Sequence, residues 1–591
     1  MKKLFVFSIF ILTSLHLFAA GLMETSPADF SYHLHNDEIT ITEYNGWAKS
    51  IVIPAKINGY PVTTIGRYAF ADEELTSVVI PNSVNFISHG AFAGNNLAGV
   101  NIPGSVTYIG DGAFYGNLLT GITIPDSVKF IGFNAFSGNK FTQITLPDDV
   151  HFYITSFYGS VYDLYQKNDR KKNTFSLSYS AAEDYDYVII NNSFIEILEH
   201  KGSDVKVIIP EKINDMPVVY IGNFAFAEKE LSNLIIPNSV EVIGEGAFYV
   251  NRLTEVIIPD SVTMMGVYAF SENELTSVSI SNSLTVLEMN VFSYNKLKSV
   301  IIPDSVTRIE EFAFADNELT DARLGNSVEY IGDGAFLSNQ LTSIIIPDSA
   351  AVMGEGAFLY NYLTSIILPD NVNFYMNTFY ISVYEKYYNH GRKKATYELS
   401  LSSFDDFNIV VLDSENLSVE ILAYKGNSKF IEIPDTIHNI PVTLIGDSAF
   451  YTMDLKEVTI PNSVRIIGPR AFESNELTSV IIPDSVTDIG YYAFSHNQLA
   501  NIVISKNIKE IKDGIFANNL IESVDIPGNV TSIGVWAFGC NELKEIKIPD
   551  SVKFIDNGAF ADNKFETVKI SSSVDVAKGA FSSEVTIIIM E

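Results

Sequence analysis

Apolar and polar positions follow one fixed pattern along most of this chain, and the stretch LTSVIIPDSVTDIGYYAFSHNQL, Leu477–Leu499, contains it once. Its L-x-x-V-x-I spacing predicts a short strand that enters from a turn, and Pro483, which lacks a backbone donor, ends that strand. A second inward-facing stretch follows at Val486 and Ile489, and Ala493–Phe494 fill the interior. The pattern therefore predicts one coil with two inward-facing stretches.

Phenylalanine marks the length of this repeat. Steps of 22 residues join the members of three series, which are Phe70 to Phe136, Phe226 to Phe358 and Phe450 to Phe560. Each series closes with one step of 21 residues, to Phe157, Phe379 and Phe581. One coil of this length cannot bury its apolar face alone, whereas coils stacked about 4.8 Å apart can. We therefore predict a repeat solenoid of about 20 repeats in three blocks, mainly short parallel β-strands with short helical turns.

The start of each block is longer than the other repeats. Pro54, Pro210 and Pro434 are each followed by another proline 27 residues later, so the first coil of a block carries five extra residues. A solenoid needs an atypical first coil because the outer face of that coil has no neighbour to stack on.

An asparagine stands three residues after most of these phenylalanines. One at each turn can bond the backbone of its own coil and of the next, which predicts a ladder that pairs buried loop groups. The members are Asn95, Asn117, Asn139, Asn251, Asn273, Asn295, Asn317, Asn339, Asn361, Asn475, Asn497, Asn519, Asn541 and Asn563.

The two junctions between blocks resemble each other. Thr155–Ser178 parallels Asn377–Ser400, and apolar residues at helical spacing predict one short amphipathic helix in each. Alternating residues beyond each junction predict a hairpin that starts the next block, like the one near the N-terminus. The basic clusters Arg170–Lys172 and Arg392–Lys394 are interpreted as solvated turns, with a docking patch as the alternative.

Composition limits the class of protein. Of 591 residues 47% are hydrophobic, which is ample for a core, and the net charge of −33 disfavours nucleic acid and anionic lipid as partners. The single cysteine, Cys540, excludes an intramolecular disulfide. The N-terminus has two lysines, a short apolar run and then small residues, which predicts a signal peptide over residues 1–20. No later segment reaches membrane-spanning length, so we expect no integral membrane segment after signal removal.

Catalytic and metal-binding patterns find little support. The nine histidines are scattered without a repeated carboxylate partner, and His89 and His496 fall at variable positions where exposure is expected. Aspartates such as Asp304 and Asp484 follow the strand prolines, but asparagine or glycine fills the same position in other repeats, which is typical of turns. A weak cation site along stacked aspartates is the alternative. We expect no enzyme activity, no cofactor and no resident metal.

One strand position in each repeat points away from the core, between the inward-facing valine and isoleucine. In the second block five of these positions are isoleucines, at Ile235, Ile257, Ile301, Ile345 and Ile367. Exposed contiguous apolar surface usually marks an interaction site. The alternative is that β-branched residues simply suit a sheet. These five residues are the candidate partner-binding residues.

The repeat N-x-L-x-x-V-x-I-P-x-S-V-x-x-I-G-x-x-A-F resembles the BspA-like bacterial leucine-rich repeats, from about residue 40 to the C-terminus except at the junctions. The family usually carries cysteine where this chain carries asparagine, in repeats about one residue longer. The resemblance implies a leucine-rich-repeat fold, a secreted or surface location in a host-associated bacterium, adhesion to host matrix proteins or other bacteria, and no catalytic residues.

The expected organisation is therefore a signal peptide (1–20) and three leucine-rich repeat blocks, at 21–180 and 181–402, each with a junction helix, and at 403–591. The expected function is an exported cell-surface or secreted scaffold for protein binding or adhesion, with the periplasm as another location. A structural envelope protein without a specific partner is the alternative. The expected partner is a host matrix protein or another bacterial surface protein.

Overall fold

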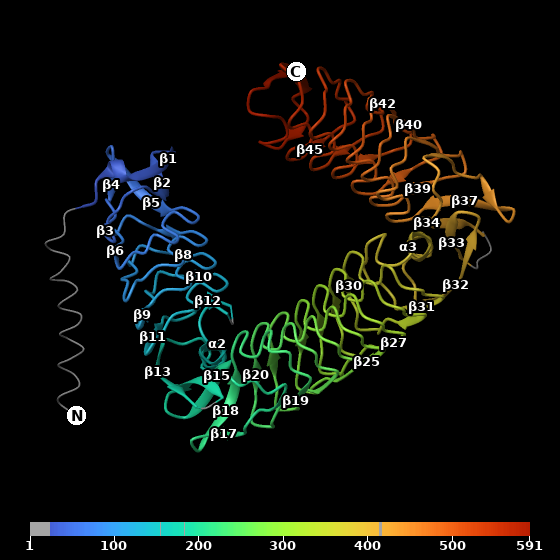
Figure 1. Ribbon diagram of the computed structural model, residues 1–591. Helices are drawn as coiled ribbons and strands as arrows, with labels where there is room; N and C mark the ends of the chain where they lie inside the picture. The colour runs from blue at the N-terminus through green and yellow to red at the C-terminus, as the bar shows by residue number, and fades with distance from the viewer. Residues whose placement is uncertain (1–23, 154, 183, 413–416, 591) are drawn as a thin grey trace, which may run out of the picture. The chain divides into compact units, whose positions relative to one another are not determined.

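The computed structural model describes residues 24–153, 155–182, 184–412 and 417–590. The predicted signal peptide lies outside the described residues. Contacts divide the chain into two compact units, unit 1 (Met1–Lys296) and unit 2 (Leu297–Glu591). Within each unit, short strands follow one another from coil to coil (Figure 1). The predicted solenoid of short parallel strands is confirmed.

Each coil contributes to two parallel ladders. The first ladder is built from the V-x-I residues and the second from the isoleucine before Gly490 and its equivalents. In the first ladder Ser479 pairs with Asn501, and in the second Ile467 pairs with Ile489, so both ladders advance by 22 residues. The valine and isoleucine of each strand face inward because side chains alternate across a strand.

Unit 1 contains both ladders. Its first ladder comprises β3 (Ser50–Val52), β6 (Ser77–Val79), β9 (Gly121–Thr123), β11 (Gln143–Leu146), β16 (Lys206–Ile208), β19 (Asn233–Ile235), β21 (Glu255–Ile257) and β23 (Ser277–Ser279). Its second ladder comprises β2 (Glu38–Tyr44), β5 (Tyr60–Ile65), β7 (Phe86–Ile87), β8 (Tyr108–Ile109), β10 (Phe130–Ile131), β12 (His151–Phe152), β15 (Phe194–His200), β18 (Met216–Ile221), β20 (Val242–Ile243), β22 (Met264–Met265) and β24 (Val286–Leu287). The remaining elements are the 3-10 turn Pro27–Asp29, β1 (Phe30–His35), β4 (Lys56–Ile57), α2 (Gly159–Lys167), β13 (Asn173–Ala181), β14 (Tyr185–Ile190) and β17 (Lys212–Ile213).

Unit 2 repeats this arrangement. Its first ladder comprises β25 (Ser299–Ile301), β27 (Asp321–Arg323), β29 (Ser343–Ile345), β31 (Ser365–Leu368), β35 (Phe430–Glu432), β38 (Glu457–Thr459), β40 (Ser479–Ile481), β42 (Asn501–Val503) and β46 (Thr567–Ser571). Its second ladder comprises β26 (Arg308–Ile309), β28 (Tyr330–Ile331), β30 (Val352–Met353), β34 (Val419–Tyr424), β37 (Ile440–Ile445), β39 (Ile466–Ile467), β41 (Asp488–Ile489), β43 (Glu510–Ile511), β44 (Ser532–Ile533), β45 (Phe554–Ile555) and β47 (Asp575–Val576). The remaining elements are α3 (Ile381–Asn389), β32 (Ala395–Phe404), β33 (Phe407–Leu412), β36 (Thr436–Ile437) and β48 (Thr586–Met590).

The core of each coil is a phenylalanine stacked on its neighbours. The rings of Phe472 and Phe494 lie 5.2 Å apart at an angle of 12°, and both are fully buried. Offset stacks of this kind add stabilisation beyond the apolar area they bury.

The asparagine ladder is also confirmed. Asn95 is buried, its Oδ1 accepts from Leu75 N at 2.8 Å, and its Nδ2 donates to Phe70 O at 2.7 Å in the preceding coil. The same bonds recur from coil to coil, because a 22-residue step returns each amide to the same place.

The junction helices and hairpins form where they were predicted. Helices α2 and α3 occupy the two junctions, and β14–β15 and β33–β34 are antiparallel hairpins, as is β1–β2 at the first block. The five extra residues of each block form a second, tight hairpin, such as β4–β5, in which Lys56 pairs with Pro61.

At each junction the blocks are joined by strand pairing, which the sequence analysis did not predict. In unit 1, β13 pairs with β11 of the first ladder and with β14, while β15 pairs with β18 of the second ladder. In unit 2, β32 and β33 connect β31 to β34 and β37 in the same way. The first ladder of one block therefore continues into the second ladder of the next.

Candidate functional site

The five candidate isoleucines lie on the outer side of the first ladder. In unit 1, Ile235 and Ile257 are 50% and 71% exposed. In unit 2, Ile301 and Ile345 are also exposed, whereas Ile367 is half-buried and pairs with Thr396 of β32. Their outward orientation follows from alternation, since the residues on either side in each strand point inward.

The longest uninterrupted run is in unit 1 and includes one residue that sequence analysis missed. Ile208 is 67% exposed and pairs with Ile235, and Ile257 follows on the next strand. Ser279 ends this run, and Arg323 interrupts the isoleucines of unit 2 between Ile301 and Ile345. We call Ile208, Ile235 and Ile257 the isoleucine column. Ile208 stands two positions before Pro210, as the other residues of the isoleucine column stand before their strand prolines. Counting back 22 residues from Ile235 does not reach Ile208, because the first coil of the block is five residues longer.

Polar residues flank the isoleucine column. Two positions earlier on the same strands stand Lys206, Asn233 and Glu255, all exposed. At later strands of the same ladder this position is occupied by serines, such as Ser299 and Ser343. The column is therefore an apolar line with a polar edge of mixed charge.

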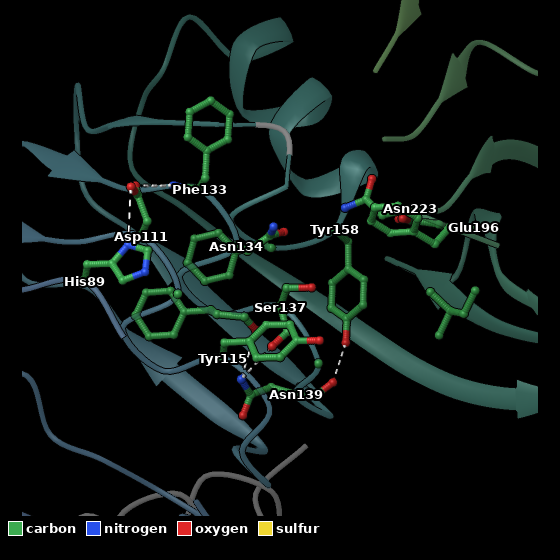
Figure 2. Close-up of a pocket in the computed structure, with 16 residues that line it drawn as sticks. His89, Asp111, Tyr115, Phe133, Asn134, Ser137, Asn139, Tyr158, Glu196 and Asn223 are labelled. Carbon is green, nitrogen blue, oxygen red and sulfur yellow. Dashed lines mark hydrogen bonds and ion pairs between the residues drawn. The ribbon is translucent and has the colours of Figure 1, made fainter. Parts of the chain in front are cut away.

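A cavity of about 720 Å³ lies at the junction in unit 1 and is drawn in Figure 2. Its lining includes Tyr115, Phe133 and Tyr158 from the end of the first block, and Asn223 from the start of the second. We call it the first-junction groove. Tyr158 Oη donates to Asn139 O at 3.0 Å, which fixes that ring beside the asparagine ladder.

The titratable groups of the first-junction groove already have partners. His89 lies 3.7 Å from Asp111 and 2.5 Å from Tyr68 Oη, and both His89 and Asp111 are partly exposed. Glu196 is buried, and its carboxyl oxygens accept from Gly159 N and Ser160 N at 3.2 Å. Burial raises the pKa of Glu196 to about 7, although these bonds and one from Ser160 Oγ act against the rise. Glu196 therefore anchors the N-terminus of α2 and is not aimed at a ligand.

The acidic turn positions have a structural use. Asp304 Oδ1 accepts from Asn326 N at 2.7 Å, and Asp484 Oδ1 accepts from Lys506 N at 3.0 Å, each in the next coil. These bonds agree with the prediction of turn chemistry. In the described part of the chain no group of three or more histidine, cysteine or acidic side chains is placed to hold a metal ion.

The basic clusters of the junctions are held by aspartates. Lys172 Nζ lies 3.0 Å from Asp126 and its backbone N donates to Asp148 at 2.7 Å. At the other junction Lys394 Nζ lies 2.6 Å from Asp348. Both lysines remain more than half exposed, so these clusters are turns closed by surface ion pairs, each of small energetic value.

The fold and its repeats define a leucine-rich-repeat solenoid. The chain matches the BspA type leucine rich repeat region in six copies, some of them overlapping, at residues 48–166, 186–298, 219–321, 267–386, 415–539 and 465–588. It belongs to this family, and the resemblance noted from the sequence is confirmed. A search of curated proteins gives no match.

Several solved structures are similar to this chain. A leucine rich cell surface protein from Faecalibacterium prausnitzii is 23% identical, with 69% of this chain and 94% of that chain covered and a TM-score of 0.34. A leucine-rich repeat protein from Bacteroides ovatus is 18% identical, covering 96% and 100%, with a TM-score of 0.22. The pneumococcal vaccine antigen PcpA is 17% identical, covering 71% and 97%, with a TM-score of 0.29. TM-scores this low do not define a common arrangement of the coils.

Proposed function

We propose that this protein is an exported scaffold at the cell surface or in secreted form, that it binds another protein, and that it has no enzymatic activity. The observation that carries the proposal is the isoleucine column. Three β-branched apolar side chains stand on adjacent strands, each half exposed or more, and none contributes to the core. Contiguous apolar surface of this kind usually marks an interaction site.

The partner we propose is a host matrix protein or another bacterial surface protein. The net charge of −33 disfavours nucleic acid and anionic lipid. Within the described residues, no helix combines the length and the apolar character that a membrane crossing needs. The N-terminal pattern of residues 1–20 supports export through a signal peptide, and the junction helices support the division into blocks at 21–180, 181–402 and 403–591.

The test is a triple substitution in the isoleucine column, Ile208→Thr, Ile235→Thr and Ile257→Thr. Threonine keeps the β-branching, so the strands should form as before. Burying one isoleucine side chain is worth about 1.5–3 kcal/mol, so binding of the purified protein to immobilised matrix proteins or bacterial cells should fall more than tenfold.

A matched control exists in the third block, where Ile481 and Val503 are exposed on adjacent strands of the same ladder. The double variant Ile481→Thr/Val503→Thr should bind like the wild type and melt at the same temperature. Equal binding by the triple variant would exclude the isoleucine column as the site.

The alternative is a structural envelope protein that spaces or coats without a specific partner. The regularity of the coils favours it, since a stack of identical ladders is stable without a ligand. Saturable binding to one partner would support the binding scaffold over the envelope protein. A protein that binds no matrix protein or cell surface, yet is found on intact cells by surface proteolysis, would be an envelope component.

A further inference from the structure

The junction in unit 2 contains a second groove, of about 470 Å³, in the place that corresponds to the first-junction groove. The last coils of the second block and the first coils of the third block line it. We call it the second-junction groove. Its chemistry differs from that of its counterpart.

Acidic side chains dominate the second-junction groove. Asp333, Glu355, Asp447 and Asp513 line it, and Arg470 is the one basic side chain in the lining. Arg470 Nε lies 3.7 Å from Glu473 Oε2, so its charge is already shared. In the described part of the chain, no lysine or arginine forms an ion pair within 4 Å with any of the four carboxylates. Four carboxylates and one basic side chain thus make the lining of the groove acidic.

A buried amide connects two of these carboxylates. Asn377 is 6% exposed, and its Nδ2 donates to Glu355 Oε1 and to Asp447 Oδ2, both at 3.2 Å. Its Oδ1 has no hydrogen-bond partner among the described residues. An unpaired buried acceptor costs free energy, so a donor that reaches it is favoured.

Aromatic side chains form the other walls. Tyr360 and Tyr375 are about half exposed, and Phe312 and Tyr492 are more than a third exposed, all in the lining. Aromatic faces attract cations, and they also cover the apolar stem that carries a guanidinium or an ammonium group.

The first-junction groove lacks the two carboxylates that Asn377 joins at the second junction. The positions equivalent to Glu355, Asn377 and Asp447 are occupied by Phe133, Thr155 and Asn223 at the first junction. Phe133 stacks on Tyr153 with ring centroids 3.5 Å apart. The pair Glu355 and Asp447 therefore has no acidic counterpart at the first junction, although Asp111 and Glu196 still line that groove.

We propose that the second-junction groove binds a cationic N–H donor on an apolar stem, a guanidinium or an ammonium group. Glu355 and Asp447 accept charge-assisted hydrogen bonds from the cation, Asn377 Oδ1 accepts a further one, and the tyrosines cover the stem. Such a group is supplied by an arginine or lysine side chain of a peptide, or by a free polyamine. This site is separate from the isoleucine column, and the proposal does not depend on it.

The experiment is titration calorimetry on the full chain with agmatine, putrescine, and the blocked tripeptides acetyl-Gly-Arg-Gly-amide and acetyl-Gly-Lys-Gly-amide. The variant is Glu355→Gln/Asp447→Asn. The first junction has Asn223 at the position equivalent to Asp447, so we expect the fold to accept an asparagine there. We expect saturable binding at one site per chain, weakened by salt and at least about tenfold weaker in the variant. A higher affinity for a tripeptide than for agmatine would identify a peptide side chain as the source of the cation. A higher affinity for agmatine would identify a free polyamine.

The matched control is Asp304→Asn/Asp484→Asn, which removes two exposed negative charges elsewhere in unit 2. It should leave binding within about twofold, because distant surface charges are screened. Equal weakening in both variants would mean non-specific attraction to an acidic protein and would overturn the proposal. The absence of agmatine binding at millimolar concentration would do the same, as would binding of a neutral oligosaccharide that survives the loss of both carboxylates.

Discussion

Asn497 Nδ2 donates to the carbonyl of Phe472 at 2.9 Å, across 25 residues of chain and from one coil to the preceding one. The same amide group donates to Phe494 O and Ser495 O, and Oδ1 accepts from Leu477 N. One buried side chain thus pairs four backbone groups that the coil leaves inside the solenoid.

Replacing Asn497 by alanine should therefore destabilise the protein. Each buried backbone group left unpaired costs about 1–3 kcal/mol, so the midpoint of denaturant unfolding should shift clearly. Asn501→Ala is the control, since Asn501 is exposed on the same coil and should change stability by less than about 0.5 kcal/mol. An Asn497→Ala protein that unfolds like the wild type would disprove the ladder's energetic role.

A second prediction concerns whole and partial coils. Deleting Ser479–Ala500 removes one full 22-residue step and leaves Asn501 in the register that Ser479 had. Deleting Ser479–Ile489 removes half a step, so the residues that follow no longer align with the inward-facing positions of the preceding coil. The first variant should keep the wild-type circular dichroism spectrum and remain soluble, and the second should not. Equal behaviour would contradict a stack of nearest-neighbour coils.

Much of this architecture follows from local pattern. The outward isoleucines, the asparagine ladder and the junction helices depend on residues that recur every 22 positions or lie within one turn, so the sequence predicts them. The strand pairing that links one block to the next does not follow from local pattern. Asn173–Ala181 alternates like any strand, and nothing in that alternation indicates that it pairs with β11. Likewise Glu196 reaches Ser160 across 36 residues, which no periodic pattern indicates.

A third prediction comes from an irregularity at the start of the second block. Tyr44, His200 and Tyr424 occupy equivalent places, since each backbone N donates to an alanine carbonyl of the next coil. Tyr44 Oη accepts from Ala48 N and Tyr424 Oη accepts from Ser428 N, both at 3.0 Å. His200 is buried against Phe226, and neither ring nitrogen has a hydrogen-bond partner in the described part of the chain.

His200→Tyr should therefore stabilise the protein by about 1 kcal/mol, because it supplies the missing bond and removes the unpaired nitrogens. A Cβ on Gly46 would lie only 2.4 Å from Tyr44 Oη, so the tyrosine hydroxyl needs a glycine beside it. Gly202 is the equivalent glycine beside position 200 and leaves the same space. His200→Phe is the comparison, since it removes the nitrogens without adding the bond. Thermal melts should rank tyrosine above phenylalanine. A tyrosine variant less stable than the wild type would contradict the assignment.

The last prediction is a pH dependence that originates at the junctions. Glu196 and Glu420 are both buried at the N-termini of α2 and α3, and Glu420 accepts from Ile381 N and Ser382 N at 3.1 and 3.0 Å. Burial raises the pKa of each carboxyl to about 7. Between about pH 4.5 and 7 the folded chain therefore holds protons that the unfolded chain has released. The free energy of unfolding must fall as pH rises through this window, by up to roughly 3 kcal/mol for each group.

The net charge of −33 acts in the same direction, so the junction contribution has to be isolated by difference. We expect the wild type to be more stable at pH 5 than at pH 8, and the variant Glu196→Gln/Glu420→Gln to have a shallower slope of stability against pH. Glu255→Gln, at an exposed glutamate of the first ladder, should keep the wild-type slope. The measurement is denaturant unfolding at half-unit pH steps. Parallel slopes for the wild type and the double variant would mean that these carboxyls titrate alike in the folded and unfolded chains.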